Sequence, residues 1–293
     1  MMVDYITKIK GKVSIYATKK TSNILDGAYT SIFMGRSMNF EDLREYIPGD
    51  NIRDIDWKAS SRSRNLLVKR FVAEKKHNVM FVLDSGKKMS GFTGQMHDKS
   101  EVALTAMGTI AYLANKNGDN TGAIYSKGEM ISLYPFRTGL YNIERILECY
   151  HQDSKSPAAS KSSITRSLDY VISHIRKRMI IFVITDELGL SQIDEAQLKR
   201  LKLQHDILVI KVGDAEVTGG EAYSVETDSY LPEFITGNKK LHEYELKLRK
   251  KMKEENDRKL LKYGVSSVEM ESDEDVVEKV IELLERHRYA NSH

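Results

Sequence analysis

The stretch NVMFVLDSGKKM, residues 78–89, gives the clearest indication of the fold. It opens with a continuous apolar run, which is typical of a strand that is covered on both faces, as in a parallel sheet. Further apolar runs of strand length, rich in Val, Ile and Phe, lie at 121–125, 179–185, 206–212 and 265–270. The sequence therefore predicts a mostly parallel sheet.

Amphipathic patterns with a helical period separate these runs. They lie at 99–116, 165–177, 192–204 and 273–286. Because strands and helices alternate, we expect an α/β fold with a doubly wound, mostly parallel sheet and helices on both faces. We expect Ser272 or Asp273 to cap the last helix. The segment 121–133 also fits a hairpin, because its SKGE sequence favours a turn.

The composition excludes several classes of protein. The chain has 293 residues, 41% of them hydrophobic and 30% charged, which allows a sizeable core under a well-solvated surface. The net charge of +3 does not demand nucleic acid or an acidic membrane as a partner. The single cysteine, Cys149, excludes an internal disulfide and a multi-cysteine metal site, and we expect it to be a small core residue. No apolar run approaches the ~18 residues of a membrane span, so we expect a cytoplasmic protein. The Lys-rich start of the chain is expected to be a solvated, frayed tail.

Two of the predicted strands end in a carboxylate, Asp84 and Asp186. In open α/β sheets, ligands bind outside the carboxyl ends of the strands. Two carboxylates delivered to that edge can hold a hard cation such as Mg²⁺. The alternative is that each Asp only caps the loop or helix that follows it.

A charge-dense segment precedes the first strand. It reads GRSMNFEDLREYIPGDNIRDIDWKASSR, residues 35–62, and holds the only Trp. The residues of interest are Arg44, Asp50, Arg53, Asp56, Trp57 and Arg62. Its guanidinium groups and carboxylates fit either an internal network that fastens this segment to the sheet domain, or a surface that grips a partner protein or a phosphate-bearing ligand. The basic stretch at 58–76 has no accompanying nucleic-acid motif, and we expect no nucleic-acid binding.

The same segment resembles the signature of a bacterial family known as domain of unknown function 58. The matching positions are Gly35, Phe40, Arg44, Glu45, Tyr46, Pro48, Gly49, Asp50, Arg53, Ile55, Asp56, Trp57, Lys58, Ser60 and Arg62. In addition, DSGKKM at 84–89 resembles the D-x-S-x-S-M motif that opens a von Willebrand factor A-like domain. The resemblance covers nearly the whole chain. It implies a family-specific region at 1–76, a von Willebrand factor A-like domain at 77–288 and a tail at 289–293.

The resemblance also implies a metal site, with one departure. Von Willebrand factor A-like domains hold a divalent metal through this motif, a later Thr or Ser, and an Asp that corresponds here to Asp186. The candidates for the later position are Ser162, Ser163 and Thr165. Gly86 and Lys88 replace the two motif serines, and neither a glycine nor an ammonium can ligate a metal through its side chain. We expect Lys88 to neutralise Asp84 and Asp186 in place of the cation, leaving at most weakly bound Mg²⁺. The alternative is that Lys88 points to solvent and a weakened metal site survives.

Signals for catalysis are poor, because the chain lacks a Walker A loop, a G-x-S-x-G elbow and an H-E-x-x-H spacing. The resemblance implies a non-enzymatic interaction module or adaptor that works with a MoxR-type AAA+ ATPase in assembling or activating client proteins. The docking face would include Ser85, Gly86, Lys88 and Ser90. The alternative function is a metal-dependent phosphoester hydrolase that uses Asp84 and Asp186.

Residues 239–262 predict one long helix with ten basic and five acidic side chains. Its thin apolar stripe consists of Leu241, Tyr244, Leu248 and Met252. The segment fits a solvated surface helix on the sheet or, alternatively, a basic docking face for an acidic partner.

Overall fold

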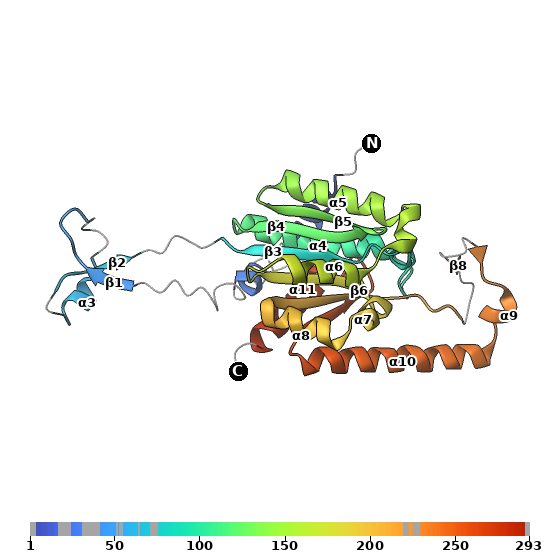
Figure 1. Cartoon of the computed structure of the whole chain (residues 1–293). Helices are drawn as coiled ribbons and strands as arrows, with labels where there is room; N and C mark the ends of the chain where they lie inside the picture. The colour runs from blue at the N-terminus through green and yellow to red at the C-terminus, as the bar shows by residue number, and fades with distance from the viewer. Residues whose placement is uncertain are drawn as a thin grey trace.

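The structure is a computed structural model that describes residues 4–16, 25–30, 42–50, 52, 55–63, 65–70, 76–218, 223–224 and 229–290. Its centre is a six-stranded sheet with the strand order β10-β7-β6-β3-β4-β5, covered by helices on both faces (Figure 1). The strands are β3 (Asn78–Leu83), β4 (Asn120–Lys127), β5 (Met130–Arg137), β6 (Ile180–Asp186), β7 (Asp206–Val212) and β10 (Ser266–Met270). The predicted α/β class is confirmed.

Five of these strands run parallel, and β5 alone is antiparallel to its neighbour β4. The hairpin expected at 121–133 is therefore present, and its turn places Gly128 at a φ of 61°. All residues of β6 and β7 are buried. This explains why their sequences are continuously apolar rather than alternating.

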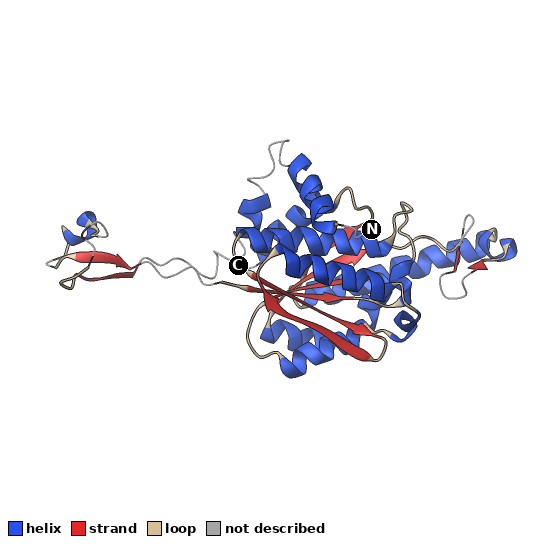
Figure 2. Ribbon diagram, turned by 90° about the horizontal axis from the view of Figure 1, so that it is seen from above, coloured by secondary structure: helices blue, strands red, loops and turns tan. Residues whose placement is uncertain are grey.

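Helices cover the sheet in two layers (Figure 2). One layer contains α1 (Tyr5–Tyr16), α4 (Lys99–Lys116), α5 (Leu140–Ser154) and α11 (Val276–Ala290). The other contains α6 (Ile164–His174), α7 (Glu187–Gln192), α8 (Glu195–Gln204) and α10 (Lys239–Lys262). Each layer buries its own apolar cluster against one face of the sheet.

Two helix boundaries differ from the sequence-based expectation. The helix expected at 192–204 is interrupted, because Asp194 caps a new helix and forms a capping box with Gln197. The last helix begins at Val276, so the cap predicted at 272 or 273 is wrong. The Ser272 hydroxyl instead accepts a hydrogen bond from the Glu274 N–H within the preceding loop.

The expected frayed N-terminal tail is also wrong for residues 4–16. Tyr5, Ile6 and Ile9 of α1 are buried in the core, and the Glu144 carboxylate accepts the N–H groups of Tyr5 and Ile6 at 2.8 Å. A Cβ on Gly108 of α4 would lie 2.1 Å from Ile9, so the two helices approach closely because this position is glycine. The helix α1, which belongs to the region predicted at 1–76, thus packs with the sheet domain.

Part of the charge-dense segment forms a small unit. It contains an antiparallel pair, β1 (Asp42–Glu45) and β2 (Leu67–Arg70), and the short helix α3 (Trp57–Ser60). Ile55 and Val68 are buried within it. The rest of its signature from 35 to 41 lies outside the described residues.

The remaining elements are short. They are the 3₁₀ turns η3 (Lys87–Ser90) and η4 (Pro157–Lys161), the strand pair β8 (Tyr223–Ser224) and β9 (Ser229–Tyr230), and the helix α9 (Glu233–Thr236). None of the helices in the described residues is both long enough and apolar enough to span a membrane.

Candidate functional site

The carboxyl edge of the sheet brings Asp84 and Asp186 together. Strands β3 and β6 are parallel neighbours, with Leu83 paired to Ile184. Both carboxylates therefore emerge at the same edge, and both side chains are almost completely buried. Two buried like charges at close range need compensating cations.

Lys88 supplies one of these cations. The turn η3 follows β3 directly and carries the Lys88 side chain back over the strand ends. Its Nζ lies 2.5 Å from Asp84 Oδ2 and 2.5 Å from Asp186 Oδ1. The side chain remains 22% exposed. The contacts expected from the sequence are present, and Lys88 does not point away into solvent.

Lys99 supplies a second cation, which the sequence analysis did not identify. It is the first residue of α4 and is fully buried. Its Nζ lies 2.7 Å from Asp186 Oδ2 and 2.6 Å from Asp214 Oδ1. Asp214 follows β7, the next strand of the sheet. We call Asp84, Lys88, Lys99, Asp186 and Asp214 the lysine–carboxylate cluster.

Further donors engage the remaining carboxylate oxygens. The Thr185 hydroxyl donates to Asp84 Oδ2 at 2.6 Å, and the Gly86 N–H donates to Asp84 Oδ1 at 3.0 Å. The Gly189 N–H donates to Asp186 Oδ1 at 2.7 Å. All four oxygens of Asp84 and Asp186 thus accept hydrogen bonds from N–H or O–H groups. This donor set does not fit a divalent cation, which needs those oxygens as ligands.

Position 189 requires glycine because side-chain atoms of Thr185 and Lys88 approach its backbone closely. A Cβ at this position would lie 2.0 Å from Thr185 Oγ1 and 2.5 Å from Lys88 Nζ. Any side chain here would displace the groups that bind the two aspartates. Within the described residues, no group of three or more His, Cys, Asp or Glu side chains is arranged to hold a metal ion.

Mutual electrostatics keep Lys88 and Asp186 charged. Burial alone would raise the pKa of Asp186, but Lys88 and Lys99 outweigh it and lower this pKa to about 2. Burial likewise opposes the charge on Lys88, but Asp84 and Asp186 raise its pKa above the usual value. Burial raises the pKa of Asp214, although Lys99 opposes the rise. At neutral pH, Lys88 and Asp186 therefore form an ion pair.

The three candidates for the later metal ligand lie elsewhere in the hydrogen-bond network. The Ser162 hydroxyl accepts the Gly128 N–H at 2.9 Å. The hydroxyls of Ser163 and Thr165 bond to each other at 2.7 Å. Among the described contacts, none of the three reaches Asp84. Thr185, which the sequence analysis overlooked, provides the hydroxyl at that carboxylate.

The two serines expected at the docking face have structural partners. The Ser85 hydroxyl donates to the Ser126 carbonyl, and the Ser90 hydroxyl donates to the Ser154 carbonyl at 2.9 Å. Ser85 is buried, and Ser90 is partly buried. The Ser85 hydroxyl thus joins the end of β3 to β4, and the Ser90 hydroxyl joins η3 to the end of α5.

Exposed apolar side chains follow Lys88 in the sequence and precede Gly189, which lies next to the Lys88 ammonium. Phe92 and Met96 lie on the loop that follows η3, and Leu188 lies one residue before Gly189. Met96 is 72% exposed and has a left-handed backbone, with a φ of 63°. This conformation is costly for a residue with a side chain. Thr93 and Gly94, both hydrogen-bonded to Glu271, hold the loop in place.

The N-terminal unit contains an Arg44–Asp50 pair. The guanidinium contacts both carboxylate oxygens, at 2.8 Å and 2.5 Å. Asp50 Oδ2 also accepts the Ile47 N–H at 2.9 Å, which closes the turn. Among the described residues, the hydrogen bonds of this unit join its own members. The network that was predicted to fasten it to the sheet domain is not found among them.

The other signature residues have separate positions. Asp56 caps α3 by accepting the Ala59 N–H at 2.9 Å. Trp57 is exposed, and so is Arg62. Arg53 lies outside the described residues.

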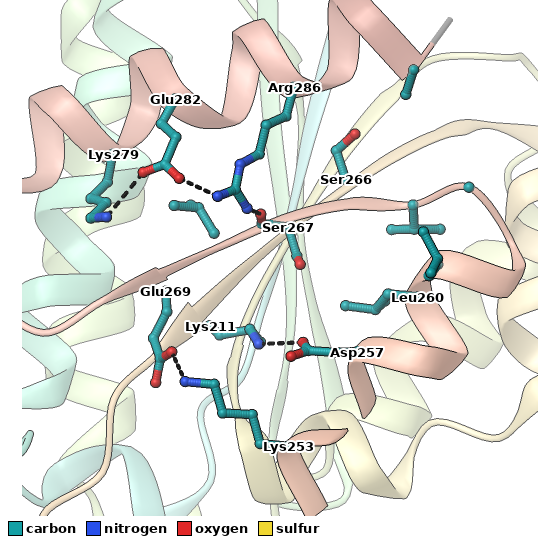
Figure 3. Close-up of a pocket in the computed structure, with 15 residues that line it drawn as sticks. Lys211, Lys253, Asp257, Leu260, Ser266, Ser267, Glu269, Lys279, Glu282 and Arg286 are labelled. Atoms are coloured by element: carbon teal, nitrogen blue, oxygen red, sulfur yellow. Dashed lines mark hydrogen bonds and ion pairs between the residues drawn. The ribbon is translucent and has the colours of Figure 1, made fainter. Parts of the chain in front are cut away.

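A groove of about 590 Å³ runs along the outer edge of β10, between α10 and α11 (Figure 3). Its charged side chains pair with one another: Lys211 with Asp257, Lys253 with Glu269, and Glu282 with both Lys279 and Arg286. None of the site residues predicted from the sequence lines this groove.

The sequence contained signals for the residues that were missed. Asp214 follows a strand end, as Asp84 and Asp186 do. Lys99 follows an N-cap, Asp98, although a helix N-terminus favours acidic side chains. A lysine in that unfavourable position indicates a specific carboxylate partner. No comparable pattern identified Thr185 or Gly189.

Comparisons with known proteins locate the chain among its relatives. The family described as "Protein of unknown function DUF58" matches residues 42–218. An uncharacterized protein of Mycobacterium tuberculosis is 24% identical over 197 residues, which cover 67% of this chain and 61% of the relative. The uncharacterized protein YeaD of Bacillus subtilis is 25% identical over 118 residues, covering 39% of this chain and 27% of the relative. The chain thus spans 61% of the length of the mycobacterial relative.

The comparison with solved structures includes a protein that aligns only weakly. The crystal structure of conserved hypothetical protein BatB from Bacteroides thetaiotaomicron aligns with a TM-score of 0.42 and 16% sequence identity. The alignment covers 72% of this chain and 98% of that chain.

Proposed function

The chain belongs to the DUF58 family, and from this premise we propose that it is a non-enzymatic protein-interaction module that docks partners at the carboxyl edge of its sheet. The observation that carries the proposal is the position of Lys88. Two of its three N–H donors are directed to Asp84 and Asp186, while the side chain stays 22% exposed. Among the described residues the third donor has no hydrogen-bond partner, and we propose that it binds an oxygen of a partner protein.

We propose that exposed apolar side chains of the loop after η3 and of α7 supply contact area beside this donor. Phe92, Met96 and Leu188 are all exposed. A polar anchor surrounded by apolar groups that exclude water is typical of the energetic centre of a protein interface. We call Lys88, Phe92, Met96 and Leu188 the docking edge.

The carboxylates beside Lys88 indicate which kind of partner group would bind it. The Lys88 ammonium already contacts two carboxylates, Asp84 and Asp186. A partner carboxylate at Lys88 would be repelled by these two carboxylates. A neutral oxygen acceptor such as a main-chain carbonyl fits Lys88 better.

We further propose that the docking edge works without a bound metal, since all four oxygens of Asp84 and Asp186 accept N–H or O–H donors. A metal-dependent phosphoester hydrolase would need those oxygens for its ions, and no observation favours that alternative. Calorimetric titration of the full chain with MgCl₂ or MnCl₂ should give no binding heat. Micromolar binding that disappears in Asp84→Ala would overturn this part of the proposal.

The family resemblance leads us to propose a MoxR-type AAA+ ATPase as the partner. The test is biolayer interferometry between the full chain and a purified MoxR-type ATPase from the same organism. Met96→Asp should weaken binding about tenfold or more, because it places a charge in the interface. Met130→Asp is the matched control, since Met130 is 70% exposed and lies on the edge strand β5. Absent binding would refute the ATPase as partner, and equal effects of both variants would refute the docking edge.

A further inference from the structure

The N-terminal half of α10, residues 239–251, continues past the sheet, as both views show (Figures 1 and 2). The C-terminal half is anchored by the buried Asn256, which donates to the Glu187 carbonyl at 2.9 Å. In the projecting half, one side of the helix is held: Glu245 accepts the N–H groups of residues 217 and 218, and Arg249 donates to the Ala215 carbonyl. The helix is thus fixed in place while its other side faces outward.

An exposed apolar stripe runs beside the held side, because Glu245 lies four residues after Leu241 and three before Leu248. Leu241, Tyr244 and Leu248 are spaced i, i+3, i+7 and are all exposed, with Tyr244 at 61%. This spacing matches consecutive a, d and a positions of a heptad. Phe234 of α9, 76% exposed, adds apolar surface just before the helix.

Two lysines flank the stripe at equivalent positions. Lys240 and Lys247 each precede an a position, so they occupy successive g positions, where side chains form ion pairs with a partner helix. Both are exposed, and the part of the chain that the structure describes provides no ion pair for either. Glu243 lies three residues after Lys240 and four before Lys247, but the described ion pairs include none between it and either lysine.

We propose that this surface, Leu241, Tyr244 and Leu248 with Lys240 and Lys247, docks an acidic amphipathic helix of a partner protein. Apolar side chains of the partner would pack into the a/d stripe, and its Glu or Asp residues would pair with the two lysines. A second copy of the same helix is disfavoured, because its lysines would carry the same charge. A membrane surface is disfavoured as well, because a strict a/d stripe is narrower than the apolar face of an interfacial helix. The proposal is independent of the docking edge.

The test uses a labelled synthetic peptide of about four heptads, with Leu at a and d and Glu at e and g. Fluorescence anisotropy with the full chain should show saturable binding that weakens as salt increases. The double variant K240E/K247E should bind at least about tenfold more weakly. A peptide with Lys at e and g should in turn bind this variant better than the unaltered chain.

A matched control separates position from net charge. K239E/K250E makes the same change of charge at exposed positions outside the seam, and it should leave peptide affinity nearly unchanged. Replacing Leu241, Tyr244 and Leu248 with Ser should abolish binding without changing the thermal unfolding of the protein. No binding of the acidic peptide, or equal losses in the two lysine variants, would overturn the proposal. Co-sedimentation with phosphatidylglycerol vesicles, lost in K240E/K247E and without peptide binding, would assign the surface to a membrane instead.

Discussion

Two pairs of lysines in this protein have opposite surroundings. Lys88 and Lys99 lie at the carboxyl edge of the sheet, each within 2.7 Å of two carboxylates. Lys240 and Lys247 lie exposed on α10, and the described residues provide no carboxylate for them. An ammonium that is buried with carboxylates is part of the folded structure, whereas an exposed and unpaired ammonium remains available to a partner.

Substitution of Lys99 is expected to have the largest effect on stability. In Lys99→Met, Asp214 loses its ammonium and Asp186 keeps only Lys88, so buried negative charge remains uncompensated. We expect urea unfolding to show a loss of about 3 kcal/mol, as for a buried pair that loses one partner. Lys240→Met, the exposed counterpart, should stay within about 0.5 kcal/mol of the unaltered chain. Equal effects in the two variants would show that the buried ion pairs are not structural.

Stability should fall at low pH as Asp186 of the same cluster becomes protonated. Its pKa in the folded protein is about 2, below the ordinary 3.8, so the folded state favours the ionised form. The resulting stability is present above about pH 4 and is lost as the pH falls through 2, with a total of about 2 kcal/mol. Unfolding free energies measured from pH 5 to pH 2 should decline more steeply in the unaltered chain than in Asp186→Asn. Parallel curves would contradict the low pKa.

Glycine substitutions test how tightly the lysine–carboxylate cluster is packed. Gly189→Ala should destabilise the protein by about 1–3 kcal/mol, because the new Cβ meets Thr185 and Lys88. Gly11→Ala in α1 is the matched control. No atom lies within 4 Å of a Cβ there, and the change should stabilise the helix by about 0.5–1 kcal/mol. Thermal unfolding measures both, and a neutral Gly189→Ala would indicate that the cluster adapts freely.

The smallest effect is expected on α10. Tyr244→Ser should change the unfolding free energy by less than about 0.5 kcal/mol, because the side chain is largely exposed. Chemical denaturation measures this change. A loss above 1 kcal/mol, on the order of a buried contact, would mean that another part of the chain covers the stripe.

Much of the fold was predictable because its strands have a strong local signal. A strand buried on both faces must be continuously apolar, so β3, β6 and β7 could be located from the sequence, and the SKGE turn identified the hairpin. The boundaries of α8 and α11 were missed because capping side chains decide them locally. The packing of α1 was missed because its short apolar pattern resembles a tail until α4 and α5 provide a surface for it.

The candidate site was only partly predictable. Asp84, Lys88 and Asp186 could be linked because strand ends meet at one edge of a parallel sheet. Ser162, Ser163 and Thr165 were candidates by order along the chain, but their hydroxyls bond to other groups. Lys99 and Asp214 reach the cluster from a helix start and a strand end that are 115 residues apart; each position carries a local signal, but nothing local pairs the two residues.

The sequence by itself determined the kind of fold and the presence of acids at its carboxyl edge, because burial sets hydrophobic periodicity and parallel strands all end on the same side. Only the tertiary structure decided which donors neutralise those acids. Charge compensation depends on distances of a few ångströms between residues far apart in the chain, and those distances exist only after the sheet and its helices have packed.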